Sequence, residues 1–404
     1  MEIWKRNLWI CWLGSFATSA ALSQIAPVLP LYIDKLGMHN LADIEMWSGI
    51  AFGSTTLIAS IFSPFWGKIA DKYGRKPMLL RASFGMSIVL ASMGFVQSVY
   101  QLVGLRMLMG TISGFNSGAI TLIATQASKE KAGWALGTLS TGAVGGTLLG
   151  PLIGGYLVEM FGFRAVFLSM GSLLLIAFLL TFFFVQENFT RTTKPLLSFR
   201  EICHTLPDKQ LIFAMFITTF TLQLALFSIE PVITIYISTL SPNTAHLAFI
   251  SGLVFASSGL SSMLVAPRLG KLADKVGAHK VILIALFAAS FLFIPQAFVS
   301  NEWQLMGLRF LVGIATGALL PSINTMLKQS ISSDIAGRIF SYNQTAQFLG
   351  MFFGAVFGGQ IAAHLGIRYV FFMTSILLFV NGLWVHHNVY KKASLEFEHA
   401  LPHS

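Results

Sequence analysis

The stretch Gly67–Lys76, GKIADKYGRK, stands between two long apolar runs and carries five charged residues from Lys68 to Lys76. A weaker copy, GKLADKVGAHK, occupies Gly270–Lys280, and the two copies begin 203 residues apart in a chain of 404. A repeat with a period of about half the chain indicates that a unit of this length has been duplicated. We therefore predict two copies of one structural unit.

Composition indicates that this unit belongs in a membrane. Hydrophobic residues make up 55% of the chain and charged residues only 10%, whereas soluble domains carry about 25% charged residues. Uncharged runs of about 20 residues recur, which is the length that crosses a bilayer as a helix. Backbone groups in lipid need internal hydrogen bonds, and the runs are too long for barrel strands, so we expect helices.

The net charge of +10 sets the expected orientation rather than indicating a nucleic-acid partner. Of the 26 Lys and Arg residues, 21 fall on one side of the predicted spans, two lie within spans, and Lys35, Arg164 and Arg368 fall on the other side. This asymmetry predicts that both termini lie in the cytoplasm, and we expect the protein in the plasma membrane. Anionic lipid headgroups are then expected partners of the basic face.

Apolar runs and polar gaps divide the chain into twelve predicted spans. The first six are 7–33, 46–70, 78–97, 101–125, 133–159 and 165–186, and the last six are 211–238, 247–270, 279–299, 303–328, 337–362 and 369–388. The predicted organisation is an N-terminal six-helix bundle over 1–186, a cytoplasmic loop over 187–210, a C-terminal six-helix bundle over 211–390 and a cytoplasmic tail over 391–404.

The loop between the second and third spans resembles the signature of the major facilitator superfamily, the twelve-helix secondary transporters. The resemblance implies an all-α membrane protein with two six-helix bundles. The repeat agrees, because Leu105-Arg106 recurs as Leu308-Arg309 and, after one insertion, Gly150 and Gly154 recur as Gly354 and Gly358. A duplication in halves of even helix number predicts a pseudo-twofold axis along the membrane normal, with the substrate site at mid-membrane.

The repeated loop is expected to act as a gate. Asp71 is an anion suited to the N-terminus of a helix from the other half, and Arg338 at the predicted start of span eleven is its expected ion partner. In the resembling family this contact holds the halves together while the cavity faces outward. The alternative is a solvated basic loop. The predicted gating residues are Gly67, Asp71, Gly74, Arg75, Lys76, Arg338 and, in the second copy, Asp274.

Span five contains a second motif with small residues at regular spacing. The segment resembles the antiporter motif that separates exporters from importers in the superfamily, and its residues are Gly146, Gly150, Pro151, Gly154 and Gly155. Small residues every four positions give a flat helix face and Pro151 is expected to kink the helix. Ordinary glycine packing between helices is the alternative.

Two charged residues within spans are the predicted proton-coupling groups. Glu230 is the only acid deep in any predicted span, and intramembrane acids are costly and commonly functional. An arginine at the place of Arg106 is present in similar proton-linked transporters, although Arg309 repeats it and leaves a structural role open. A water-facing glutamate beside the Pro231 break is the alternative for Glu230.

The predicted substrate cavity is largely apolar with a few polar anchors, which suits varied amphipathic compounds. Each of its candidate residues could instead serve helix packing: Gln24, Phe52, Asn116, Gln223, Phe227, Tyr342, Asn343 and Gln347. The sequence has no Walker-type phosphate loop, so we expect transport to be driven by an ion gradient, with protons as the coupling ion. The two cysteines, Cys11 and Cys203, have no metal-ligand spacing, and we expect no cofactor and no metal.

The resulting prediction is a monomeric, proton-coupled exporter of lipophilic or cationic small molecules, within the drug/proton antiporter family. An alternative with the same fold is a transporter of one metabolite, and an alternative of another class is a non-transporting receptor or channel. Gating motifs in both halves argue against a channel. A membrane enzyme would need a clustered catalytic set in the spans, and none is evident in the sequence.

Overall fold

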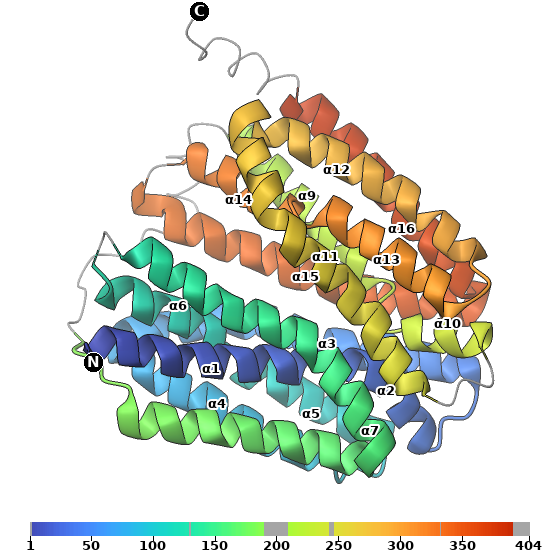
Figure 1. Cartoon of the computed structure of the whole chain (residues 1–404), viewed down its shortest axis with the longest axis horizontal. Coiled ribbons are helices and arrows are strands. Elements are labelled where there is room, and N and C mark those ends of the chain that lie inside the picture. The colour runs from blue at the N-terminus through green and yellow to red at the C-terminus, as the bar shows by residue number, and fades with distance from the viewer. Residues whose placement is uncertain (1, 129–130, 190–208, 242–245, 332, 391–404) are drawn as a thin grey trace, which may run out of the picture.

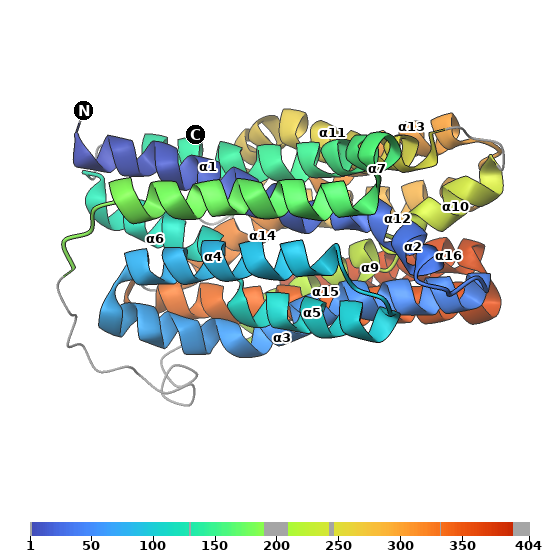
Figure 2. The same cartoon turned by 90° about the horizontal axis from the view of Figure 1, so that it is seen from below.

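The computed structural model describes residues 2–128, 131–189, 209–241, 246–331 and 333–390 as a bundle of long helices (Figures 1 and 2). Side chains at 132, 133, 271, 274, 333–337 and 390 are not described. No strand occurs among the described residues. The central part of the 187–210 loop and the 391–404 tail lie outside them, and so does the side chain of Asp274, although its backbone belongs to a helix.

The N-terminal half is built from seven helical elements. They are α1 (Ile3–Ser23), α2 (Ile25–Lys35), α3 (Leu41–Tyr73), α4 (Arg75–Met93), α5 (Val99–Ile112), α6 (Phe115–Gln126) and α7 (Ala132–Phe184). Within α7, Gly162 has φ 79° and ψ 174°, which is not helical and which favours glycine. This break divides α7 into two helices at the position expected between spans five and six.

The C-terminal half repeats this plan. Its helices are α9 (Lys209–Phe227), α10 (Ile233–Leu240), α11 (Leu247–Val276), α12 (Ala278–Phe293), α13 (Glu302–Thr316), α14 (Leu319–Gln329), α15 (Ser333–Leu365) and α16 (Ile367–Val385), with short turns η1 (Pro295–Phe298) and η2 (His386–Tyr390). The duplication is visible in the backbone, because Gly74 and Gly277 both have positive φ, and so do Gly162 and Gly366.

The helices are apolar enough to span a membrane. In the described part of the chain, 9 helical stretches are long and apolar enough to cross a membrane, or up to 10 if the pair α1 and α2, bent by 42°, is one span. One of these stretches is the 51-residue segment that Gly162 divides. The prediction of a multi-pass helical membrane protein is confirmed, and the count of twelve spans stays a prediction.

The two halves meet along α3 with α15 and along α7 with α11. We call the end where α1 begins (left in Figure 1) and α16 ends (top in Figure 1) the termini end, and the other the opposite end. Near the opposite end the backbones touch: a Cβ at Gly49 would lie 2.3 Å from the Ala355 carbonyl oxygen, and one at Gly155 would lie 2.4 Å from that of Ala248.

Contacts at the termini end are different. A Cβ built on Gly67 or Gly270 would meet nothing within 4 Å. Each hydrogen bond that joins two described residues across the halves lies toward the opposite end, on α2, α7, α10 or α11. The halves are therefore packed at the opposite end in this conformation.

Candidate functional site

The loop that organises the sequence lies at the termini end, where it joins α3 to α4. Gly74 has φ 94°, a left-handed conformation that lets the chain turn between the two helices. The backbone N–H groups of Arg75 and Lys76 donate to the Glu187 carboxylate, at 2.8 and 2.7 Å. Glu187 follows α7, so it caps the free N-terminus of α4 with a negative charge.

Asp71 is engaged within its own half. Its carboxylate pairs with Arg75 one helical turn later, and its side chain is 50% exposed. Arg338 on α15 is partly buried and makes no ion pair with any described acid. The predicted contact between Asp71 and Arg338 is not made in this conformation, and because it is expected in the opposite conformation it stays a prediction.

The glycine motif of α7 packs on two neighbours. Cβ atoms at Gly146 and Gly150 would lie 2.2 Å from the Phe16 carbonyl oxygen and the Ser23 hydroxyl oxygen of α1, and Gly154 lies against Gln24. Gly155 instead faces α11, and the carbonyl of Pro151 lies against Gly252 of that helix. The motif thus joins α7 to α1 within the half and to α11 across the halves, and its antiport role stays a prediction.

Arg106 binds the backbone of α3. Its Nε donates to the Ala51 carbonyl at 2.6 Å and its Nη2 to the Phe52 carbonyl at 3.1 Å, while the Thr55 hydroxyl donates to the Arg106 carbonyl at 2.9 Å. The side chain is only 4% exposed. These bonds fasten α5 to α3, which is the structural role that the sequence left open.

Arg309 is the equivalent residue of the other half, and it is used differently. It is 6% exposed, and its Nε and Nη2 atoms have no hydrogen-bond partner in the described structure. Its charge interacts with that of Glu230, although no N···O distance within 4 Å joins them. The structure thus brings Arg309, rather than Arg106, to Glu230.

Glu230 lies in the break between α9 and α10. Residues 228–232 form turns rather than continuous helix, and Pro231 within them cannot donate a backbone hydrogen bond. The side chain is partly buried. An acid at a helix break beside a buried arginine is a place where a proton or a cation can be bound within the membrane.

The predicted cavity residues fall into three environments. The rings of Phe52 and Phe227 lie 6.0 Å apart across the two halves. The amides of Asn116 and Asn343 donate within their own halves, to the Ser19 hydroxyl at 3.1 Å and to the side-chain Oδ1 of Asn324 at 3.2 Å.

The remaining cavity candidates pack against glycines or are partly buried. Gln24 is buried beside Gly154, without a hydrogen-bond partner for its amide atoms in the described structure, and Gln223 is buried beside Gly350. Tyr342 and Gln347 are partly buried on α15. The prediction that these residues line one substrate cavity remains a prediction.

Glu159 forms a bridge that the sequence did not reveal. Its carboxylate accepts the Phe249 N–H at 2.9 Å, in the first turn of α11, and lies 2.9 Å from the His246 Nδ1. We call these contacts the Glu159 bridge. Together with the hydrogen bond from the Thr234 hydroxyl to the Pro27 carbonyl, it joins the halves at the opposite end. Glu159 and Glu187 were missed because acids at span ends look like ordinary surface charges.

Comparison with known proteins agrees with this architecture. The family model described as Major Facilitator Superfamily matches residues 11–294 and 211–398. The chain is 47% identical over 382 residues to the multidrug resistance protein MdtG of Salmonella paratyphi A, covering 94% of this chain and 95% of that protein. It is equally similar to MdtG of Salmonella schwarzengrund, at 47% identity over 94% and 95%.

Solved structures are similar in fold at low sequence identity. A bacterial homologue of the human lysosomal transporter Spinster, solved in an inward-facing and occupied conformation, has a TM-score of 0.79 at 14% identity, covering 97% of this chain and 98% of that one. The nucleoside transporter NupG has a TM-score of 0.75 at 13% identity, over 95% and 100%. The chain belongs to the major facilitator superfamily and is a membrane transporter, not an enzyme.

Proposed function

We propose that this transporter exports lipophilic and cationic compounds across the plasma membrane in exchange for protons. Support comes from 47% identity, over 94% of the chain, to proteins named multidrug resistance protein MdtG. The observation that carries proton coupling is the partly buried Glu230 at a helix break, next to the buried Arg309 with its unpaired guanidinium atoms.

One carboxylate can serve both the substrate and the proton. When Glu230 is ionised, its charge interacts with Arg309 and attracts a cationic substrate. When Glu230 is protonated, the substrate loses its counter-charge and the positive charge of Arg309 is no longer compensated, which favours release of a cation. Binding of one ligand thus opposes binding of the other, which is the requirement for exchange.

In alternating access, the two halves would make contact at one end of the molecule and then at the other. In the described conformation the halves pack at the opposite end, where the Glu159 bridge lies. With both termini in the cytoplasm, as the charge distribution predicts, this conformation opens inward. In the outward-open conformation Asp71 would leave Arg75 and pair with Arg338, and Gly67 would lie against the neighbouring helix.

Substrate selectivity would come from apolar contact more than from hydrogen bonding. The pair Phe52 and Phe227 offers aromatic surface from both halves, and Gln24 offers an unpaired amide. Few polar anchors and a large apolar surface tolerate substrates of different shape. We propose the protein as a monomer, with protons, amphipathic substrates and membrane lipids as its partners.

Efflux of a fluorescent lipophilic cation from energised cells tests the function. Cells with the wild-type protein should retain less dye than cells with an empty vector, and a proton uncoupler should remove the difference. Glu230→Gln should lose the uncoupler-sensitive efflux at equal membrane abundance. Equal efflux by the variant would assign coupling to another residue, and no dye movement by either protein would favour transport of one specific metabolite.

A further inference from the structure

A basic pocket lies at the opposite end of the N-terminal half, away from the proposed transport path. It has a volume of about 540 Å³ and lies between the end of α2, the turn from α4 to α5 and the Gly162 break of α7. Lys35, Gln97 and Arg164 line it. Lys35 and Arg164 are two of the three basic residues predicted on that side of the membrane.

Both cations are oriented by aromatic rings rather than neutralised by acids. The Lys35 Nζ lies 5.3 Å from the Phe163 ring centre, and the Arg164 Cζ lies 5.5 Å from the Phe95 ring centre. Neither side chain forms an ion pair with a described acid. The adjacent acid, Asp34, pairs with His39 at 3.0 Å, so the positive charge of the pocket is not compensated from within the pocket.

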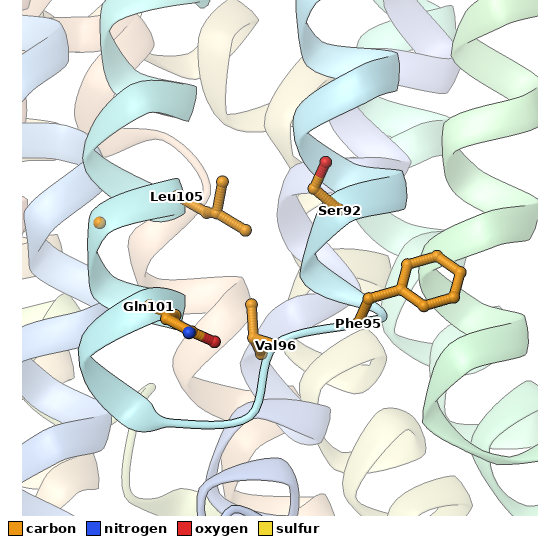
Figure 3. A pocket seen from close by; sticks show the side chains of 6 residues that line it. Ser92, Phe95, Val96, Gln101 and Leu105 are labelled. Carbon is orange, nitrogen blue, oxygen red and sulfur yellow. The ribbon is translucent and has the colours of Figure 1, made fainter.

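An apolar groove continues from this pocket between α4 and α5. It has a volume of about 380 Å³ and is lined by Ser92, Phe95, Val96, Gln101, Gly104 and Leu105, of which Val96 also lines the basic pocket. Figure 3 shows Ser92 and Leu105 on the two helices that face each other across it. A Cβ on Gly104 would meet nothing within 4 Å, so the groove is open at this residue.

We propose that the pocket and groove together bind an anionic phospholipid. The phosphate lies between Lys35 and Arg164, whose charges suit an anion with several acceptor oxygens. One acyl chain lies along the groove, beside Leu105 and Gly104. An anionic headgroup is favoured over a zwitterionic one because the pocket has two cations and no free described acid. By the predicted orientation, the lipid belongs to the outer leaflet.

The C-terminal half supplies an internal comparison. The repeat places Tyr236 and Arg368 where the N-terminal half has Tyr32 and Arg164, but Thr239 stands in place of Lys35. The two tyrosines make equivalent hydrogen bonds, from the Tyr32 hydroxyl to the Met93 carbonyl and from the Tyr236 hydroxyl to the Gln296 carbonyl. The second half thus keeps the scaffold and lacks one of the two cations.

Lipid retention by the purified full-length transporter tests the proposal. The protein is placed in nanodiscs of dioleoyl phosphatidylcholine with a small fraction of dioleoyl phosphatidylglycerol. It is then extracted from the nanodiscs, and the lipid molecules that stay bound to it are counted by native mass spectrometry. The wild type should retain phosphatidylglycerol selectively. The double variant Lys35→Gln/Arg164→Gln should reduce this retention by about tenfold or more, whereas Arg368→Gln should not change it. The affected side chains are exposed, so the variants should fold.

A variant of the groove distinguishes binding of a phospholipid from binding of a free anion. Gly104→Leu adds an apolar side chain at a position of the groove where a Cβ would meet nothing within 4 Å. It should weaken phosphatidylglycerol retention while binding of glycerol 3-phosphate stays unchanged. Unaltered phosphatidylglycerol retention in the double variant would overturn the site. Unaltered retention in Gly104→Leu, with glycerol 3-phosphate competing as well as the lipid, would identify a small-anion site and overturn the lipid assignment.

Discussion

Arg106 and Arg309 occupy the same place in the repeat, but they interact with different groups. Arg106 donates to two carbonyl oxygens of α3, whereas Arg309 keeps two unpaired nitrogen atoms and its charge acts on Glu230. A buried cation that is already satisfied by the backbone holds two helices together. A buried cation without such bonds is available to respond to the charge of a nearby acid.

Substitution of Arg309 should change the pH dependence of efflux. Arg309→Gln removes the positive charge that favours ionised Glu230, so the proton is held more tightly. The pH of half-maximal efflux should rise by on the order of one unit, measured as dye efflux across a pH series at equal protein abundance. An unchanged pH profile would contradict the coupling of these two residues.

Substitution of Arg106 should mainly destabilise the protein. Arg106→Gln removes the two hydrogen bonds that the guanidinium donates to the Ala51 and Phe52 carbonyls, and a hydrogen bond from a charged group contributes roughly 1.5–3 kcal/mol. Thermal unfolding in detergent should begin a few degrees lower, with the pH of half-maximal efflux unchanged. A shift of that pH in Arg106→Gln would instead support the proton-coupling role predicted from the sequence.

The sequence could predict that both arginines are buried, but not what each one binds. The repeat and the hydropathy give the position of a residue along a span, and the cost of burying a charge then demands a partner. The partner depends on how neighbouring spans are rotated and tilted, which hydropathy does not encode. For the same reason the sequence identifies Glu230 as the important acid, whereas its electrostatic interaction with Arg309 comes from the structure.

At the scale of elements, the glycines of α7 decide how closely the helices approach. Gly150 lies against α1 so tightly that a Cβ would be 2.2 Å from the Ser23 hydroxyl oxygen and 2.6 Å from the Ala20 carbonyl oxygen. Gly137 lies on the same helix, and a Cβ there would meet nothing within 4 Å. The two positions therefore form a matched pair.

Valine should be tolerated at one of these positions and not at the other. Gly150→Val forces α7 away from α1, and overpacking of this kind costs typically 1–3 kcal/mol, so folded protein and efflux should both fall. Gly137→Val should retain wild-type levels of both. Size-exclusion chromatography of the detergent-solubilised variants gives the folded fraction, and equal fractions would contradict the packing described for α7.

At the N-terminus of α4, the sequence predicts the turn but not the residue that caps the helix. The glycine, the acid and the basic residues of Gly67–Lys76 predict a tight turn at a membrane surface. Glu187, which accepts both N–H groups at 2.8 and 2.7 Å, is more than 100 residues away. A contact between segments so distant in sequence follows from the arrangement of the helices and cannot be read from the loop motif.

At the scale of the whole molecule, the helical membrane fold could be predicted because membrane insertion imposes strong rules. Long apolar runs, loop charge and a 203-residue repeat each constrain the topology. The conformation could not be predicted, because the same sequence must support packing at either end. The described state makes the Glu159 bridge at the opposite end and pairs Asp71 with Arg75 at the termini end.

Removing contacts at the two ends should shift the conformational balance in opposite directions. Glu159→Ala removes the bridge and should favour opening at the opposite end, whereas Asp71→Asn should disfavour that state by removing the predicted contact with Arg338. Distances between spin labels, one pair at each end of the molecule in a cysteine-free background, report both changes. Shifts in the same direction would contradict the proposal that contacts at the two ends stabilise opposite conformations.

The most direct test of the central claim is proton movement driven by substrate. Proteoliposomes with an acidic lumen contain the purified transporter and a lumenal pH dye, and a lipophilic cation is added outside. The account predicts that the wild-type protein alkalinises the lumen as substrate enters, and that Glu230→Gln, which has no ionised carboxylate to hold the cation, moves neither protons nor the cationic substrate. Equal alkalinisation by wild type and Glu230→Gln would contradict the assignment of Glu230, and substrate accumulation without proton movement in the wild type would contradict proton-coupled exchange.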